Sequence, residues 1–485
     1  MGYDVVLFQP RAGSWEKLGI RIPDSLLSIV GSLSKKGYSI KIIDTRIDFN
    51  WKKTFLSILK QESLLAVGIT SMTGVQIRYA LEISKFVKDN SQIPIIWGGV
   101  HASLLPKQTI ENKNIDVVIL GEGDYSFTEV VENLQKKDSL NKVKGIFFKE
   151  KNKIIKTEQR ELIKNLDLLP DLPYELIDFK DYYSMNLGTG RSISLSTSRG
   201  CPFNCTFCYN KAFYGNSWRA MSADKVVKLI KYFVEKHGIR NFYFHDDNFS
   251  VDLKRVENIA KGIIKEKLNI TYGLLGTRIG TLKKMSDKLL ALLVKSGCLN
   301  IDIGIESGSA RILSLIKKNL TISDVLLVNK KLAKHNIISK YTFIIGFPTE
   351  TKKELSQSVK LAKKLMSENK NCYTPFFILT AYPGTEMFDL AIKHGYKAPN
   401  KLEDWSECNF KDVYKLYPWL SKKTIRKLIN IQFFSNLASR NIKYKINNKL
   451  LRLLFELYHP IAKFRFHNNF YFLPLDRIIV NKLIK

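Results

Sequence analysis

The sequence predicts an α/β protein: a doubly wound parallel sheet, then a partial parallel βα barrel, then a mainly helical C-terminal region. Short apolar runs alternate with segments that carry apolar residues at helical spacing, first over residues 1–145 and again over 193–395. Such alternation builds parallel sheets that are covered by helices. From residue 396 to 485 the strand rhythm is absent, and the chain is basic and aromatic.

The first series of apolar runs predicts the doubly wound sheet. Ligands of such sheets sit beyond the carboxyl ends of the strands, and here those ends are rich in Gly and hydroxyl residues. Residues 146–192 lack a sustained period and contain Pro170 and Pro173, so they are expected to connect two domains. The strands of the sheet are expected at residues 3–10, 39–44, 64–71, 93–99 and 115–123.

The second series predicts the barrel, in which catalytic residues belong at the carboxyl ends of the strands. Helical segments separate its strands. These strands are expected at residues 193–198, 240–247, 271–277, 299–307, 339–348 and 373–383.

The chain is long and strongly basic. Its 485 residues allow about three domains. The 77 Lys and Arg exceed the 45 Asp and Glu by 32 charges, which could serve nucleic acid, an anionic membrane or acidic substrates. Lys, Ile and Asn are abundant throughout, so compositional bias is a competing explanation. No apolar stretch reaches the roughly 18 residues of a membrane span, and the N-terminus resembles a strand more than a signal peptide. A cytoplasmic protein is expected.

The six cysteines are too few for a disulfide scaffold. Three of them crowd into residues 201–208, which indicates one metal centre. The other three, Cys298, Cys372 and Cys408, stand apart and are expected to be buried and inert.

The cysteine loop, SRGCPFNCTFCYN over residues 198–210, directly follows a predicted strand. Thiolates of Cys201, Cys205 and Cys208 could hold three corners of a cubane cluster and leave the fourth iron open to a ligand with an amine and a carboxylate. A structural zinc site, with His245 as the fourth ligand, and accidental clustering are the alternatives. The position of the loop at the end of the first barrel strand favours a catalytic cluster.

The segment CPFNCTFC resembles the signature of the radical S-adenosylmethionine (AdoMet, or SAM) superfamily, and the resemblance covers roughly residues 190–390. Later strand ends, HDDNF, IGIESGS, FIIGFPTET and TAYPGTE, resemble the AdoMet-contacting motifs of that family. The resemblance implies a [4Fe–4S] cluster on the three cysteines of the loop. It also implies AdoMet contacts from Phe207, Asp246, Asp247, Glu306, Gly346 and Gly384.

These residue types suit the implied roles. The three carboxylates are acceptors for an ammonium group or ribose hydroxyls, and the two glycines let the backbone approach a cofactor closely. Each carboxylate could equally be a solvated loop end or part of a salt bridge.

The pairing of the N-terminal domain with such a barrel resembles the cobalamin (vitamin B12)-binding subclass, whose first domain is Rossmann-like. The matching stretches are residues 37–48, 66–74, 97–106 and 117–131. The Asp-x-His-x-x-Gly motif of many cobalamin proteins is missing, so a loop-capping or ring-edge role is preferred for His101 over axial ligation. The alternative is a domain that only packs on the barrel or holds substrate. The resemblance implies cobalamin contacts from Ser71, Thr73, Gly98, Gly99, His101 and Gly121.

The resemblance implies reductive cleavage of AdoMet to a 5′-deoxyadenosyl radical, with cobalamin-dependent methylation of an unactivated carbon. The expected partners are a small-molecule or lipid-like substrate and a reducing protein such as flavodoxin or ferredoxin. Cyclisation or rearrangement is an alternative outcome. An RNA-acting methylthiotransferase is disfavoured because no cysteine precedes Cys201. A non-catalytic nucleic-acid-binding metalloprotein leaves the strand-end motifs unexplained.

The C-terminal region allows three interpretations. Residues 413–485 hold 15 Lys and Arg against two acidic residues, and residues 423–475 mix these cations with Phe, Tyr and Leu. The preferred interpretation is a helical cap with its aromatic residues toward the barrel. Peripheral contact with an anionic membrane, at its inner face, comes second. Nucleic-acid binding comes last.

Overall fold

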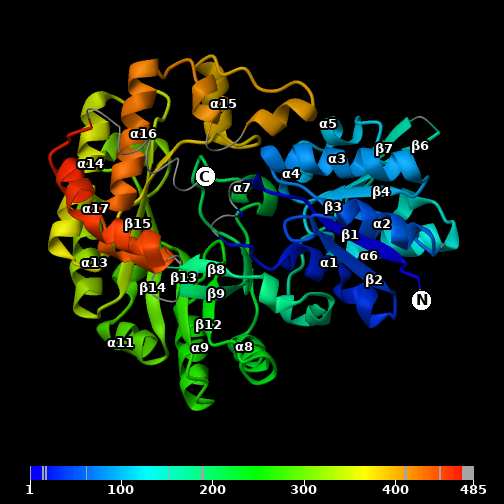
Figure 1. Cartoon of the computed structure of the whole chain (residues 1–485), viewed down its shortest axis with the longest axis horizontal. Coiled ribbons are helices and arrows are strands. Elements are labelled where there is room, and N and C mark those ends of the chain that lie inside the picture. The colour runs from blue at the N-terminus through cyan, green and yellow to red at the C-terminus, as the bar shows by residue number, and fades with distance from the viewer. Residues whose placement is uncertain are drawn as a thin grey trace.

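The computed structural model describes residues 2–13, 16, 19–61, 63–151, 153–186, 190–408, 412–446 and 449–471. A parallel sheet domain and a larger open barrel lie side by side, and the C-terminal helices cover the barrel (Figure 1). This arrangement confirms the predicted fold class.

The N-terminal sheet has the strand order β2-β1-β3-β4-β5-β6-β7, and its first five strands are parallel. The strands form because their residues are apolar on both faces; in β1 every residue is buried. Helices α1 and α6 pack together, while Trp51 of α2 stacks edge-on against Phe86 of α3. The elements are β1 (Val5–Gln9), α1 (Asp24–Lys35), β2 (Ile40–Asp44), α2 (Trp51–Leu59), β3 (Ala66–Thr70), α3 (Val75–Asn90), β4 (Ile95–Gly98), α4 (Val100–Leu104), α5 (Pro106–Ile110), β5 (Val117–Ile119) and α6 (Gly123–Lys136).

Two antiparallel strands extend this sheet at one edge: β6 (Ile146–Glu150) pairs with β5, and β7 (Lys153–Lys156) pairs with β6. Both lie in the range expected to be a connector. The lysines of β7 suit an edge strand, because charged side chains discourage pairing with another chain.

The barrel sheet has the order β16-β15-β14-β13-β12-β9-β8, with β17 also paired to β15. It is parallel from β9 onward and confirms a partial parallel barrel. Its last predicted strand is divided into β16 and β17. The strands are β8 (Ser184–Asn186), β9 (Gly190–Leu195), β12 (Asn241–Phe244), β13 (Thr271–Thr277), β14 (Cys298–Glu306), β15 (Ile338–Ile345), β16 (Cys372–Tyr373) and β17 (Phe376–Ile378).

Helices follow the barrel strands and carry ordinary start signals. The Ser222 hydroxyl caps α8, and Thr351 with Glu354 forms a capping box at α14. Cys298 and Cys372, on barrel strands, are buried as predicted, and so is Cys408. The helices are α8 (Ala223–His237), α9 (Leu253–Lys265), α10 (Ile279–Lys284), α11 (Asp287–Lys295), α12 (Ala310–Leu315), α13 (Ile322–Lys334), α14 (Lys352–Glu368) and α15 (Glu386–Lys393).

The C-terminal region is helical, as predicted. A 3₁₀ turn at Glu403–Glu407 packs on the N-terminal domain, where the Trp405 indole N–H donates to Gln108 Oε1 at 2.6 Å. Helix α16 (Lys422–Leu437) packs on β17, and α17 (Lys449–His467) packs on α16. Among the described helices, none combines the length and the apolar character needed to cross a membrane.

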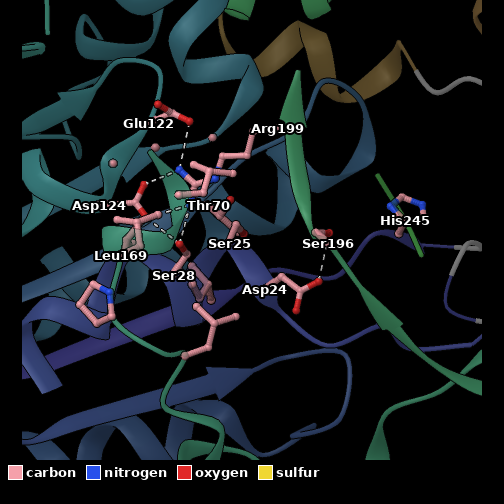
Figure 2. A pocket seen from close by; sticks show the side chains of 18 of the residues that line it. Asp24, Ser25, Ser28, Thr70, Glu122, Asp124, Leu169, Ser196, Arg199 and His245 are labelled. Carbon is pink, nitrogen blue, oxygen red and sulfur yellow. Dashed lines mark hydrogen bonds and ion pairs between the residues drawn. The ribbon is translucent and has the colours of Figure 1, made fainter. Parts of the chain in front are cut away.

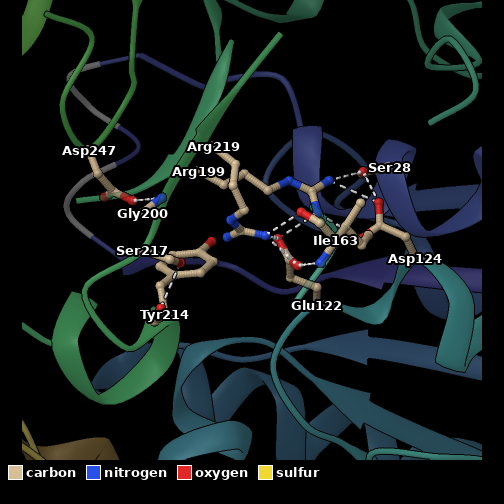
Figure 3. A network of polar contacts seen from close by, with 10 residues as sticks. All are labelled: Ser28, Glu122, Asp124, Ile163, Arg199, Gly200, Tyr214, Ser217, Arg219 and Asp247. Atoms are coloured by element: carbon tan, nitrogen blue, oxygen red, sulfur yellow. Dashed lines mark hydrogen bonds and ion pairs between the residues drawn. The ribbon is translucent and has the colours of Figure 1, made fainter. Parts of the chain in front are cut away.

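A buried ionic network joins the two domains (Figure 3). Arg199 donates to Asp124 through both of its terminal nitrogens, at 2.9 Å each, and to Glu122 at 3.0 Å. Arg219 binds the same Glu122 at 2.8 Å and the Ile163 carbonyl at 2.9 Å. Burial opposes the charge on Arg199, yet the bonds from Asp124 and Glu122 raise its pKa. The strand that leads into the cysteine loop is thus tied to the loop that follows β5.

Replacing Arg199 with Ala should lower the free energy of unfolding by about 3 kcal/mol or more, because the buried Asp124 loses its partner. Urea unfolding of the apoprotein measures the loss. Lys85→Ala is the control, since it removes an exposed pair with Asp89 and should cost under about 1 kcal/mol. Equal losses in the two variants would contradict a supporting role for the network.

Candidate active site

A cavity of about 1420 Å³ lies where the two domains meet (Figure 2). Its wall on the N-terminal side comes from the ends of β1, β3, β4 and β5. Its wall on the barrel side comes from the ends of β9 and β12 and from helix α7 (Asn210–Tyr214), directly after the cysteine loop. Lining residues from these elements include Gln9, Thr70, Gly98, Gly121, Ser196, His245, Asp247, Tyr209 and Tyr214.

The cysteine loop is held on three sides. It leaves β10 (Ser198–Gly200), which pairs with β11 (Trp218–Ala220). Gly200 has φ +79°, and a Cβ there would lie 2.3 Å from the Ser217 carbonyl oxygen, so only glycine fits. Further along, the Thr206 N–H donates to the Ile316 carbonyl, and the Thr206 carbonyl accepts from the Met387 N–H. The backbone of the loop is therefore fixed by the helices that follow two barrel strands.

The three predicted ligands Cys201, Cys205 and Cys208 lie on one loop, and the thiols of Cys201 and Cys208 are both within electrostatic reach of Cys205. Burial raises the pKa of Cys201, and it raises the pKa of Cys208 to about 12. At Cys201 two groups oppose this penalty: Asn248 Nδ2 lies 3.8 Å from Cys201 Sγ, and the charge of Arg278 acts on the same thiol. Arg278 also lies 3.1 Å from Cys205 Sγ. Hydrogen bonds to sulfur are a usual means of tuning iron–sulfur clusters, so these two donors suit cluster-bound thiolates at Cys201 and Cys205.

His245, the fourth ligand that a zinc site would need, is engaged elsewhere. His245 Nε2 contacts the Arg21 guanidinium, and burial, followed by Arg21, lowers the pKa of His245 to about 3. Within the described ranges no three His, Cys, Asp or Glu side chains are placed to hold a single metal ion. In a cubane cluster each thiolate binds a different iron atom. The three cysteines can therefore hold a cluster without converging on a single metal ion.

The two adjacent aspartates after β12 point to different places. Asp246 is buried and accepts from the Thr197 N–H and hydroxyl at 3.0 Å, so it holds the segment that leads into the cysteine loop. Burial raises its pKa to about 6 despite these bonds. Asp247 accepts from the Gly200 N–H at 3.2 Å and lines the cavity. Both stay predicted AdoMet residues, since Asp247 lines the cavity and Asp246 Oδ2 is buried without a hydrogen-bond partner in the described structure.

Glu306 ends β14 with φ +73° and is buried against Lys318, whose ammonium lies 2.8 Å from Glu306 Oε1. Gly304 makes room for this pair, because a Cβ there would lie 2.2 Å from that oxygen. Arg278 donates to the Lys318 carbonyl as well as to Cys205. A continuous chain of contacts therefore links Glu306 to the cysteine loop.

The other predicted AdoMet residues, Phe207, Gly346 and Gly384, stay predictions, and each also makes contacts within the chain. Phe207 joins an apolar cluster with Ile312, Phe347 and Leu379. Gly346 has both backbone groups engaged: its N–H donates to Glu350 and its carbonyl accepts from Trp419. Gly384 has φ +77°, and a Cβ there would lie 3.3 Å from Leu104 and 3.4 Å from Ala212. Gly384 thus lies where the barrel, α4 and α7 meet.

Three of the predicted cobalamin residues line the cavity: Gly98, Gly99 and Gly121. At Gly98 and at Gly121 a Cβ would meet no protein atom within 4 Å. Gly99, with φ +93°, lies so close to β3 that a Cβ would come within 2.6 Å of the Ser71 carbonyl oxygen. Gly98 and Gly121 therefore leave this part of the cavity lining open, while Gly99 allows the close approach of β3.

The other three lie behind the cavity wall. Ser71 is fully buried and donates to the Gly98 carbonyl at 3.0 Å. His101 Nδ1 bonds the Thr73 hydroxyl at 3.0 Å, and the His101 ring packs edge-on against Trp405. Burial lowers the pKa of His101 to about 3. The placement of His101 fits the preferred loop-capping role and brings no axial ligand into the cavity.

Sequence reasoning did not single out Arg21, Arg199, Arg278 or Lys318. Arg278 follows the predicted strand at 271–277, so the strand-end rule could have found it. Arg21 and Asp24 line the cavity from the segment between β1 and α1. Asp24 faces the barrel residue Ser196, whose hydroxyl lies 3.5 Å away (Figure 2).

Comparisons with known proteins match these features. The model of the radical SAM superfamily matches residues 195–362, and that of the B12 binding domain matches residues 12–131. An uncharacterized methyltransferase of Pyrococcus horikoshii is 32% identical over 377 residues, which are 77% of this chain and 80% of that protein. The chain belongs to the radical SAM superfamily.

Within that superfamily the chain carries the B12 binding domain before its barrel. It is a cobalamin-dependent radical SAM enzyme, with a [4Fe–4S] cluster, AdoMet and cobalamin as cofactors. An anaerobic magnesium-protoporphyrin IX monomethyl ester cyclase of Cereibacter sphaeroides is 27% identical over 75% of this chain and 59% of its own length. The cobalamin-dependent radical enzyme OxsB, solved with aqua-cobalamin and AdoMet, shares the fold with a TM-score of 0.75 at 16% identity, over 99% of this chain and 74% of OxsB.

Asp24 gives this radical SAM enzyme a testable pH dependence. Burial raises the pKa of Asp24 to about 7, so its ionisation favours the unfolded chain. The quantity to follow is the free energy of unfolding of the wild-type apoprotein minus that of Asp24→Asn. This difference should fall as the pH rises from about 4 to about 7, by at most about 1.4 kcal/mol per pH unit. Above that range it should stay constant. Urea unfolding of both proteins across this range measures it. A difference in unfolding free energy between the two proteins that is the same at all pH values would contradict a raised pKa of Asp24.

Proposed function

We propose that this chain transfers a methyl group to an unactivated carbon of a small-molecule or lipid-like substrate. One observation carries the proposal: a single cavity is bounded both by the strand ends of the B12 binding domain and by the residues next to the cysteine loop. A corrin and a substrate can therefore face the cluster end of the barrel without leaving the protein.

The residues fit the cofactors. Cys201, Cys205 and Cys208 would hold the cluster, and the open positions at Gly98 and Gly121 would face the corrin. Asp247, beside the loop, would meet AdoMet. When bound, the cluster with AdoMet supplies radical chemistry and the corrin supplies a methyl group, while the protein supplies orientation and exclusion of water.

Side chains around the cysteine loop hold it in place and line the cavity beside it. Arg278 and Asn248 donate to two of the thiolates, and the Arg278 guanidinium also stacks over Phe203 with its carbon 3.9 Å from the ring centroid. These contacts hold the loop in one conformation. Tyr209, Phe213 and Tyr214 line the cavity between the loop and the N-terminal domain, and their rings would keep water from the reacting carbon.

The proposal includes two partners. A reducing protein such as flavodoxin or ferredoxin would deliver electrons to the cluster. The basic C-terminal region would contact an anionic membrane surface peripherally. Because one named relative is a cyclase, cyclisation is the second candidate reaction, and the mass of the product distinguishes it from methylation.

Cys205→Ala should abolish formation of 5′-deoxyadenosine after anaerobic reconstitution with iron and sulfide, reduction with dithionite and addition of AdoMet. The variant loses one of three ligands of the cluster. Cys298→Ala is the matched control, because Cys298 is a buried strand residue outside the loop and its loss should leave the activity. Cleavage retained by Cys205→Ala would refute the assignment of the loop.

Gly98→Phe should abolish retention of cobalamin while AdoMet cleavage continues. A Cβ at Gly98 meets no protein atom within 4 Å, so the ring would enter the cavity without disturbing the fold. Visible absorbance after gel filtration measures the bound corrin. Gly280→Phe is the control, because Gly280 is equally open but lies on α10, outside the cavity lining. Full retention of corrin by Gly98→Phe would place cobalamin elsewhere.

A further inference from the structure

Helix α17 has two faces of different character. One face is buried: Phe455, Ala462 and Phe466 pack inward, and the His459 ring bonds the Leu437 carbonyl of α16 at 2.9 Å. The Phe466 ring also meets Phe376 of the barrel strand β17. This face attaches the helix to the rest of the protein.

The opposite face is apolar and exposed. Six large apolar side chains recur at helical spacing, so they lie on one side of the helix and form one stripe. Their exposed fractions run from 41% to 68%. We call this set the α17 stripe: Leu450, Leu453, Leu454, Leu457, Ile461 and Phe464.

Other helices in the described part of the chain show no comparable stripe. Val294 on α11, Leu327 on α13 and Ile392 on α15 are exposed large apolar residues, but each stands alone on its helix. Scattered apolar side chains are normal on a protein surface, whereas a contiguous apolar patch marks an interaction site. Within the described residues, the α17 stripe is therefore the apolar surface that best fits an interaction site.

Exposed cations outnumber carboxylates on α16 and α17. Arg452 and Lys463 are exposed on α17, between the stripe and the buried face, and Lys422, Lys423, Arg426 and Lys427 are exposed at the start of α16. Glu456 of α17 lies next to the stripe and pairs loosely with Lys443 at 3.9 Å. An apolar stripe on a basic helical region is the pattern of a helix that lies in the interface of an anionic bilayer.

We infer that the α17 stripe docks on a membrane of anionic phospholipids, with the helix axis parallel to the surface. Leu457 and Phe464 enter the acyl region, while the exposed cations of α16 and α17 attract the anionic headgroups. The inference rests on the peripheral contact proposed for the C-terminal region and is independent of the reaction proposed for the cavity. Helix α17 lies on the side of the barrel away from the N-terminal domain, so docking leaves the cavity between the domains unobstructed (Figure 1).

Vesicle flotation of the full-length reconstituted protein tests the inference. Wild type should float with vesicles of phosphatidylcholine and phosphatidylglycerol, and much less with phosphatidylcholine alone. The double variant Leu457→Gln/Phe464→Gln should bind the anionic vesicles about tenfold more weakly or worse, because two large apolar side chains no longer enter the bilayer. The matched control Val294→Gln/Leu327→Gln should bind like wild type. Added salt should weaken the binding of wild type.

Other occupants of the stripe give different results. A second copy of the chain would make wild type dimeric in solution and the stripe variant monomeric, with no vesicle binding by either, which would overturn the inference. Truncation after Tyr471 should leave vesicle binding intact. Binding that depends on residues 472–485 and survives the stripe substitutions would likewise overturn it.

Cleavage of AdoMet by the stripe variant, measured without vesicles, should equal that of wild type. This readout shows that the variant is folded, and it separates a failure of membrane docking from a failure of the proposed chemistry. Equal flotation of the variant and wild type would refute the role of α17, whatever the cleavage assay shows.

Discussion

The Arg199 guanidinium, shared between Asp124 and Glu122, fixes the cysteine loop relative to the B12 binding domain. Arg199 lies two residues before Cys201, and Arg219 from the paired strand reaches the same Glu122. Burying two cations and two carboxylates is costly unless each is hydrogen-bonded, and here each makes bonds of 2.8–3.0 Å, the Arg199–Asp124 pair bidentately, while Nε and Nη2 of Arg219 have no partner in the described structure. A rigid ionic network, rather than a flexible linker, therefore sets the separation between the cluster-bearing loop and the cavity floor.

That separation matters because both domains turn the ends of their strands toward one cavity. The connector contributes to it as well: Ile163, Leu166 and Leu169 pack against Met221, and residues 166–172 form part of the wall. A ligand that fills the cavity would touch the first sheet, the connector and the barrel at once. The site thus exists only in the assembled chain, and neither domain holds it alone.

The sequence predicted the architecture well because apolar periodicity reports burial directly. The barrel strand expected at residues 271–277 has those bounds, and strand ends did converge on the cavity. Side-chain direction was beyond such reasoning. Asp246 and Asp247 are neighbours, yet one turns under the loop and the other toward the cavity. His101 is covered by Trp405, a residue some 300 positions away whose contact no local pattern could reveal. The strands β6 and β7 were missed because they form an antiparallel extension with no helix between them, so the strand–helix alternation that marks the parallel strands is absent there.

The segment around Glu306 shows how a weak motif acquires meaning from its contacts. A left-handed conformation costs a non-glycine residue about 1–2 kcal/mol, so surrounding interactions must hold Glu306 there. Its buried ion pair with Lys318 does so, and Gly304 is small because the pair occupies the space that a side chain would need. Since the Lys318 carbonyl also accepts from Arg278, which donates to Cys205, the strained end of β14 and the cysteine loop support each other. The glycine and the glutamate of this motif therefore act together to order the cluster side of the barrel.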